Sequence, residues 1–202
     1  MPRVSRAEAQ RHRQQIEEAS ARLFRERGLS VSVADLMSEV GLTHGGFYGH
    51  FDSKDALAAI AMARAFEEAA ARWRKRLADA AGRAALLNAY LHPDNRNVPA
   101  RGCPLAALAT DVAREPADKP VRAAYLTGLA SLLEILEQAQ PAADPQQARH
   151  DALVQMCTLV GAMVLARATN GQPLSDELLE AARRHLVDNP PTTLPAGESR
   201  PG

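Results

Sequence analysis

Alanine is the residue that most restricts how this chain can fold. The 202 residues include 40 alanines, mixed along the sequence with leucine, arginine and glutamate. These residues favour helix, and no segment shows the sustained alternation of apolar and polar residues that is typical of a half-buried strand. The sequence therefore predicts an all-α protein.

Length and composition exclude several classes of protein. An apolar content of 46% is too high for a disordered chain, and 202 residues suit one domain of ordinary size, alone or with a small module attached. The apolar stretch from Cys157 to Ala166 is shorter than the ~18–20 residues that span a bilayer. The first residues lack the apolar core of a signal peptide, and the two cysteines form no Cys-x-x-Cys pair. We therefore expect a soluble, cytoplasmic protein without a disulfide scaffold.

Charge is balanced overall but uneven at the N-terminus. The chain has 24 basic and 24 acidic residues, so its formal net charge is zero. Within residues 1–15 a single acid, Glu8, stands against four arginines, which are Arg3, Arg6, Arg11 and Arg13. Such an arm could attract phosphates or could be a solvated chain end, and the sequence leaves both interpretations open.

The first third of the chain predicts a helix-turn-helix. Apolar spacing predicts helices at about residues 6–27, 32–40, 43–51 and 53–81. Ser32 and Asp35 form a capping-box-like start of the second helix, and Gly41 ends it. Two short amphipathic helices joined by a glycine turn are typical of a helix-turn-helix, whose second helix enters the DNA major groove. We therefore place this motif at about 32–51.

The predicted second helix of this motif is unusual because it contains Gly45 and Gly46. Each glycine costs a helix about 1 kcal/mol relative to alanine, which a purely structural helix would rarely tolerate. A close approach of the backbone to phosphate is one reason to retain them.

Residues 11–60 resemble the TetR/AcrR family of bacterial transcriptional regulators. The resemblance rests on Leu-Phe-x-x-x-Gly at the end of the first helix, on Gly-Leu-Thr-His-Gly-Gly-Phe-Tyr-Gly-His-Phe at 41–51, and on Ser-Lys-Asp-Ala-Leu at 53–57. Met37 departs from the small residue that many relatives have there. The resemblance implies a DNA-binding domain at 1–52 and a helical effector-binding and dimerisation domain at 53–187. The proline-rich tail at 188–202 is predicted to be disordered.

Several residues match the family's DNA-contacting positions. The resemblance implies phosphate contacts for Ser32 and Lys54, and places Tyr48 and His50 against the DNA backbone or thymine methyl groups. Tyr48 and His50 could instead pack at the edge of the core, where we expect Phe47 and Phe51. Thr43, His44 and Gly45 match the positions that meet base edges and the nearby backbone. They lie on the outer face of the second motif helix, which also offers Gly46 and Tyr48.

The predicted C-terminal domain supplies an effector pocket and a dimer interface. Further helices are predicted at about 83–91, 104–114, 119–140, 145–169 and 175–187, with a loop at 92–103. The resemblance implies that the last two helices pair with those of a second copy. Because aromatic residues are few, we expect a small, neutral, largely apolar effector. The candidate pocket residues are Phe66, Trp73, Tyr90, Cys103, Tyr125, Met156 and Met163.

The sequence thus predicts a homodimeric repressor that a small effector releases from a palindromic operator, with two alternatives. Cys103 precedes a predicted helix, where the helix dipole favours a thiolate, and the preceding loop is expected to leave the thiol reachable, so it could sense oxidants or electrophiles. It could instead be a small apolar cap beside Pro104. The apolar surroundings of Cys157 predict a hidden, unreactive thiol. The second alternative is a helical ligand-binding protein or enzyme without a DNA role. Catalytic motifs and clustered metal ligands are absent from the sequence, so we expect no enzyme activity, cofactor or metal.

Overall fold

The fold is all-α, as predicted. The computed structural model describes residues 5–141 and 144–188, and helices are the only regular secondary structure in these ranges. In chain order the helices are α1 (Arg6–Arg27), α2 (Val33–Glu39), the 3-10 helix η1 (His44–Gly49), α3 (Lys54–Leu77), α4 (Gly82–Tyr90), α5 (Pro93–Asn97), the 3-10 helix η2 (Pro99–Arg101), α6 (Pro104–Arg114), α7 (Pro120–Gln138), α8 (Pro145–Ala168), α9 (Pro173–Arg183) and the π-helical turn η3 (Arg184–Asp188).

Local chemistry explains where most of these helices begin. Ser5, Ser32 and Ser53 each accept a hydrogen bond from a backbone N–H in the first turn of α1, α2 and α3. In the C-terminal domain, proline occupies the first position of α6, α7, α8 and α9. Proline suits that position because its missing N–H would have had no partner within the helix.

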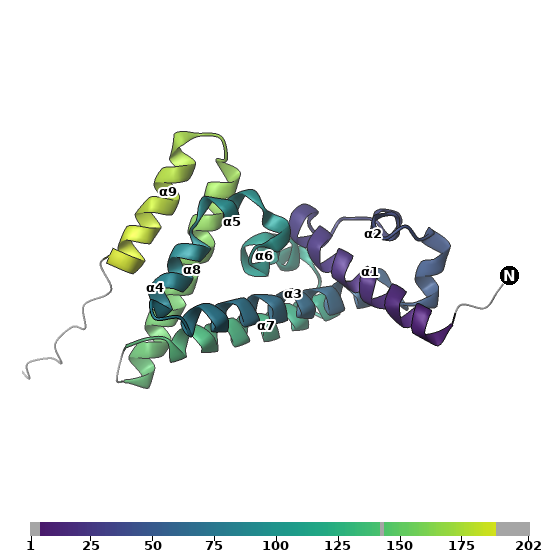
Figure 1. Cartoon of the computed structure of the whole chain (residues 1–202), viewed down its shortest axis with the longest axis horizontal. Coiled ribbons are helices and arrows are strands. Elements are labelled where there is room, and N and C mark those ends of the chain that lie inside the picture. The colour runs from purple at the N-terminus through teal and green to yellow at the C-terminus, as the bar shows by residue number, and fades with distance from the viewer. Residues whose placement is uncertain (1–4, 142–143, 189–202) are drawn as a thin grey trace, which may run out of the picture.

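Helix α3 belongs to both halves of the molecule. It begins beside α1, runs into the C-terminal domain and is accompanied along its length by α7 (Figure 1). The two helices are parallel, because Lys119 at the start of α7 pairs with Asp55 at the start of α3, and Gly128 lies against Phe66 farther along both. Helices α4, α8 and α9 lie at the end opposite α1 and α2 (Figure 1).

Helix α8 has the length and hydropathy of a membrane-crossing helix. Its most apolar window has a mean hydropathy of 1.4, and it alone meets this test among the residues that the structure describes. It nevertheless packs against α6, α7 and α9, and Leu159 and Met163 are completely buried. An apolar helix within a helical domain satisfies the same composition test, so α8 gives no sign of a membrane span.

The structure differs from the sequence-based helices in three places. The second helix of the predicted motif is a 3-10 helix rather than an α-helix, and the predicted loop at 92–103 contains α5 and η2. The last helix begins at Pro173, two residues before the predicted cap, because the Ser175 hydroxyl instead donates to the Ala166 carbonyl. The predicted tail lies outside the described residues except for Asp188.

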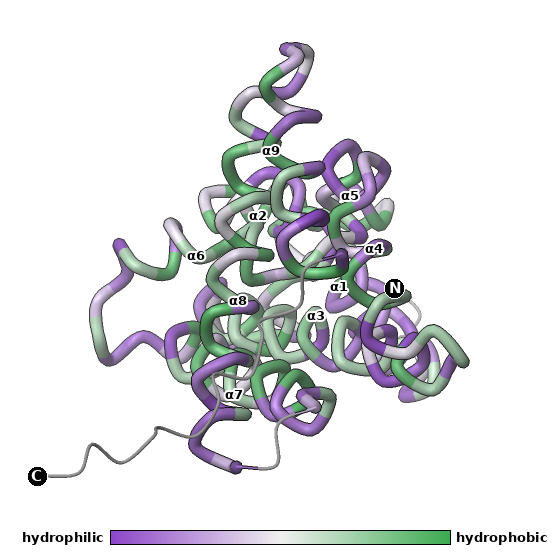
Figure 2. Tube along the Cα trace, turned by 90° about the vertical axis from the view of Figure 1, so that its left-hand side faces the viewer, coloured by the Kyte–Doolittle hydropathy of each residue, from purple (hydrophilic) through white to green (hydrophobic). Residues whose placement is uncertain are grey.

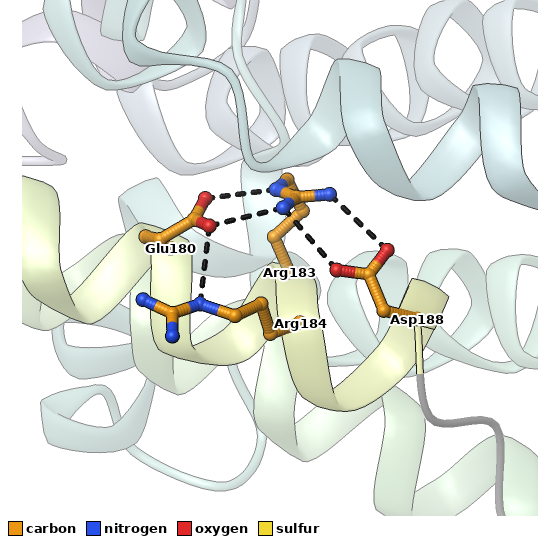
Figure 3. Close-up of polar contacts among 4 residues, drawn as sticks. All are labelled: Glu180, Arg183, Arg184 and Asp188. Carbon is orange, nitrogen blue, oxygen red and sulfur yellow. Dashed lines mark hydrogen bonds and ion pairs between the residues drawn. The ribbon is translucent and has the colours of Figure 1, made fainter.

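Charged side chains hold the end of α9 together. Arg183 bonds both carboxylate oxygens of Glu180 and also pairs with Asp188, while Arg184 donates to Glu180 (Figure 3). The π-helical turn places Asp188 within reach of Arg183. These pairs are exposed, so each is expected to contribute little to global stability.

The contact between α3 and α7 generates a test of the fold. A Cβ atom at position 128 would overlap the ring of Phe66, so Gly128→Ala should lower the free energy of unfolding by about 1–3 kcal/mol. Denaturant unfolding followed by circular dichroism measures this. Phe66→Leu removes the ring, so Gly128→Ala should cost less in that background. Equal losses in both backgrounds would contradict the proposed overlap.

Candidate nucleic-acid interface and cavity

Buried aromatic and aliphatic side chains position the helix-turn-helix. Phe47 from η1 is completely buried together with Leu36 and Met37 from α2, and the Phe51 ring lies 5.7 Å from that of Phe47. Gly41 adopts a left-handed backbone angle, φ +71°, in the turn between α2 and η1. Glycine adopts this conformation without a Cβ clash, so it allows the chain to reverse sharply there.

The outer face of η1 is exposed as one surface. Thr43, His44, Gly45 and Gly46 are all exposed, and Tyr48 retains 66% of its accessible area. The rings of His44 and Tyr48 approach edge to face, with their centroids 6.3 Å apart. Tyr48 is therefore not a residue at the edge of the core, which removes the packing alternative for this side chain.

The glycines of η1 are not required by internal packing. A Cβ atom at Gly45 or Gly49 would meet nothing within 4 Å, and one at Gly46 would make only ordinary contacts with Met37 and Thr43. Three glycines within six residues weaken the α-helix, which accounts for the 3-10 geometry. The space in front of Gly45 is thus open to an external partner.

The remaining predicted contact residues differ in their availability. Lys54 is half-buried at the first position of α3. The Ser32 hydroxyl is exposed but already donates to Asp35 and accepts from its backbone N–H, in the predicted capping box. His50 is half-buried, and burial, followed by the nearby His12 and Arg13, lowers the pKa of its imidazole. His50 is therefore uncharged at neutral pH.

The basic arm is partly structural. Arg13 lies over the Phe51 ring, 4.6 Å from its centroid, donates to the His50 carbonyl and pairs with Glu17. It thereby attaches α1 to the end of η1 and is not free to bind phosphate. Arg6 and Arg11 are exposed on α1, whereas Arg3 lies outside the described residues.

A cavity of about 580 Å³ opens between α3, α4 and the segment from α5 to the start of α6. Trp73, Tyr90 and Cys103 line it, as three of the seven predicted pocket residues. The other four do not line it, because helix packing places them in the core: Phe66 meets Tyr125 edge to face at 5.5 Å, and Met156 and Met163 are buried on α8.

Sequence reasoning missed the arginines of this cavity. Arg72 and Arg76 from α3 and Arg101 from η2 are part of its lining. The sequence could have indicated Arg72 and Arg76, because residues four apart lie on the same face of a helix and these two flank the predicted pocket residue Trp73. Arg101 could not be found in this way, since only the folding of the 92–103 segment brings it to α3.

The two cysteines lie in the opposite environments from those predicted. Cys103 is buried with 4% of its area exposed, whereas Cys157 is exposed on α8. Burial raises the pKa of the Cys103 thiol, although the backbone N–H groups of Leu105 and Ala106 at the start of α6 act in the opposite direction. The helix dipole was foreseen correctly, but the loss of solvent outweighs it.

Three contacts join the cavity region to the DNA-binding helices. The Leu29 backbone N–H donates to Asp111 of α6 at 2.8 Å, and Arg25 of α1 pairs with Glu68 of α3. Helix η2, which carries Arg101 into the cavity, also packs against α1. A shift of α6 or η2 would therefore be felt directly by α1.

Known proteins share both the motif and the architecture. The sequence profile described as "Bacterial regulatory proteins, tetR family" matches residues 16–60, which contain the whole helix-turn-helix. Residues 16–60 thus have the sequence of a tetR-family DNA-binding domain. No curated protein matches the chain in sequence. A domain of this type makes the chain a DNA-binding transcriptional regulator rather than an enzyme, and helices α4 to α9 form the helical domain that follows it.

Solved structures extend the likeness to the C-terminal domain. A TetR regulator from Chloroflexus aurantiacus superposes with a TM-score of 0.73 at 25% identity, covering 90% of this chain and 95% of that one. A TetR-family regulator from Agrobacterium tumefaciens gives 0.69 at 24%, covering 89% and 97%. The reduced form of NemR from E. coli gives 0.71 at 21%, covering 88% and 96%. The last two likenesses show the TetR fold alone.

Burial of Cys103 generates a prediction about thiol reactivity. Under native conditions we expect Cys103 to resist alkylation, because its thiol is buried and its pKa is raised, and any rapid reaction to occur at Cys157. Mass spectrometry after a timed maleimide pulse measures this. The Cys157→Ser variant, whose single thiol is Cys103, should therefore stay unlabelled until it is unfolded. Rapid labelling of the Cys157→Ser variant would contradict the burial of Cys103.

Proposed function

We propose that this protein is a homodimeric repressor that binds a palindromic operator and is released by a small-molecule effector in the cavity lined by Trp73 and Tyr90. The exposed face of η1, held by the buried Phe47, is the observation that carries this proposal. Such a regulator acts where the chromosome is, so we expect it in the bacterial cytoplasm.

The proposed DNA contacts divide by role. Thr43 and His44 begin the exposed face and would meet base edges, while Gly45 and Gly46 would let the backbone approach the phosphates. Tyr48 and Lys54 would contact the DNA backbone. His50 could only donate from a neutral ring, and Ser32 would have to exchange its bond with Asp35 for a phosphate contact, so we expect smaller contributions from both.

A dimer would bury the apolar residues that a single chain leaves exposed at the end formed by α8 and α9. Leu153, Val154, Cys157 and Leu165 are exposed on α8, and Leu174 is exposed on α9. Figure 2 views the molecule from this end, and apolar stretches recur along both helices. Residues 153, 157, 161 and 165 are spaced four apart and share one face of α8. A Cβ atom at Gly161 would meet nothing within 4 Å, so a second helix could approach closely there.

Release by an effector would use the contacts between the cavity and α1. A ligand that moved Arg101 or the start of α6 would disturb the packing of η2 on α1 and the bond from Leu29 to Asp111. In a symmetric dimer this would change the distance between the two copies of η1. The thiol-based alternative is less favoured because Cys103 is buried and its pKa is raised.

DNA binding tests the role of η1. Two copies of η1 must enter successive major grooves, so duplexes selected from a random pool should contain half-sites about 34–36 Å apart or a multiple of this. Tyr48→Ala and Lys54→Ala should weaken binding to every sequence. His44→Ala should also relax base preference, by about 1–3 kcal/mol at one position. Anisotropy titrations at fixed salt measure these effects, and unchanged affinity in all three variants would remove η1 from the interface.

Gly45→Ala separates a DNA contact from an effect on folding. Because the space beside Gly45 is empty, alanine should preserve the free energy of unfolding or raise it by up to about 1 kcal/mol. Its methyl group should nevertheless weaken operator binding by obstructing the approach of the backbone. A stable variant with undiminished affinity would show that the glycine serves no contact with DNA.

Oligomeric state tests the dimer face. Light scattering should give twice the chain mass of 21.7 kDa for the wild type. Cys157→Arg should shift the protein toward monomer, because it places an unpaired charge in the proposed interface. The matched control is Leu126→Arg, which alters a residue that is 66% exposed on α7 and is not among the residues of the proposed α8–α9 face. Loss of the dimer in the control, or a dimer that tolerates Cys157→Arg, would place the interface elsewhere.

A further inference from the structure

The cavity gathers positive charge without a matching negative charge. Arg72, Arg76 and Arg101 line it, and Asp94 is the one acid among the lining residues. Asp94 lies next to His92, with 3.3 Å between Asp94 Oδ2 and His92 Nδ1. Among the residues that the structure describes, none of the three guanidinium groups forms an ion pair or a hydrogen bond, although most other arginines do.

Two of these charges, Arg72 and Arg76, are close enough to repel each other. Burial, followed by repulsion from Arg25, lowers the pKa of Arg72; Glu68 partly offsets this, and Arg76 adds to the lowering. A further guanidinium, that of Arg167, lies directly behind Gly102, which belongs to the cavity wall. An anion bound among these groups would relieve the repulsion and accept charge-assisted hydrogen bonds.

The inner wall of the cavity is apolar. Trp73, Leu86 and Tyr90 are buried there, and the Trp73 and Tyr90 rings meet edge to face at 5.9 Å. The Tyr90 hydroxyl is completely buried beside the Cys103 thiol, although it forms no hydrogen bond of ordinary geometry among the described residues. The exposed arginines surround this apolar wall, and the volume of about 580 Å³ lies within the range of small-molecule sites.

We propose that this cavity binds an organic anion, with its apolar body against Trp73 and Leu86 and its carboxylate or phosphate held by Arg72, Arg76 and Arg101. The identification of this anion as the effector rests on the proposed function, but its binding does not. The sequence analysis instead predicted a neutral effector, because it considered only the scarcity of aromatic residues and not the three arginines.

Trp73 reports on the site directly because it is the single tryptophan of the chain and lies in the cavity wall. Four probes share a ten-carbon chain and differ in their head group: decanoate, decyl phosphate, decanol and decylamine. Titration of the full-length protein, followed by Trp73 emission, should show saturable binding of one or both anions. The stronger of the two identifies the head group. Decanol and decylamine should bind at least about tenfold more weakly, because they cannot accept bonds from three cations.

Matched variants locate the anion. Arg72→Gln and Arg101→Gln should each weaken binding of the preferred anion by about tenfold and leave decanol binding unchanged. Arg74→Gln is the control, since it removes the same charge from the same helix at a residue outside the cavity lining. The guanidinium groups of Arg72 and Arg101 form no internal bonds, so both variants should fold normally, which circular dichroism checks.

Three results would overturn the proposal. The first is equal affinity for decanol and the anions, and the second is an equal loss of anion affinity in Arg74→Gln and Arg72→Gln. The third is the absence of a saturable change in Trp73 emission with either anion up to about 1 mM. Operator binding measured on the same samples separates the two proposals. Anion binding without any DNA binding would refute the proposed function and retain the site, whereas DNA binding that only decanol weakens would refute the site and retain the regulator.

Discussion

The packing of α7 along α3 is the constraint on which both ends of this molecule depend. Helix α3 starts next to the helix-turn-helix and ends beside the cavity, so its position determines how the two are related. Gly128 makes this packing possible, because only a residue without a side chain leaves room for the Phe66 ring. The ring in turn packs against Tyr125, which extends the contact along α7. A rigid shared helix of this kind can transmit a change at one end to the other.

Charge is arranged differently at the two ends of α3. Near α1 the cations are paired: Arg25 and Arg64 both bond Glu68, and Arg64 also bonds Glu18. Beyond this point Arg72 and Arg76 form no ion pair among the described residues, although the charge of Glu68 still acts on Arg72. Paired charges hold α1 on α3, whereas unpaired charges leave positive potential in the cavity. The segment carrying Arg101 lies between these regions and borders both, which places it where a ligand could affect the DNA-binding domain.

Much of the fold and part of the candidate site could be predicted from the sequence. Capping serines and helix-starting prolines act locally, so the bounds of α3, α6 and α8 were foreseen to within a few residues. Tyr48 is exposed and Phe47 is buried because these neighbouring residues lie on different sides of one short helix. The 3-10 geometry of η1 was missed because two effects compete there. The glycines disfavour an α-helix, whereas the packing of Phe47 holds the segment in a helical turn, and the sequence does not show which effect is stronger.

The sequence by itself determined the helical class, the helix-turn-helix and the family resemblance, because these depend on residues close together along the chain. Tertiary structure decided which side chains share a cavity and which thiol is buried. Cys103 and Cys157 differ in exposure because α3, α4 and the 92–103 segment enclose the first, while none of the described elements covers the second. The same folding brings Arg101 to Arg72 and Arg76, and so determines the charge of the cavity. The burial of a side chain and its distance from other charges depend on every element that packs around it, so local sequence patterns do not reveal them.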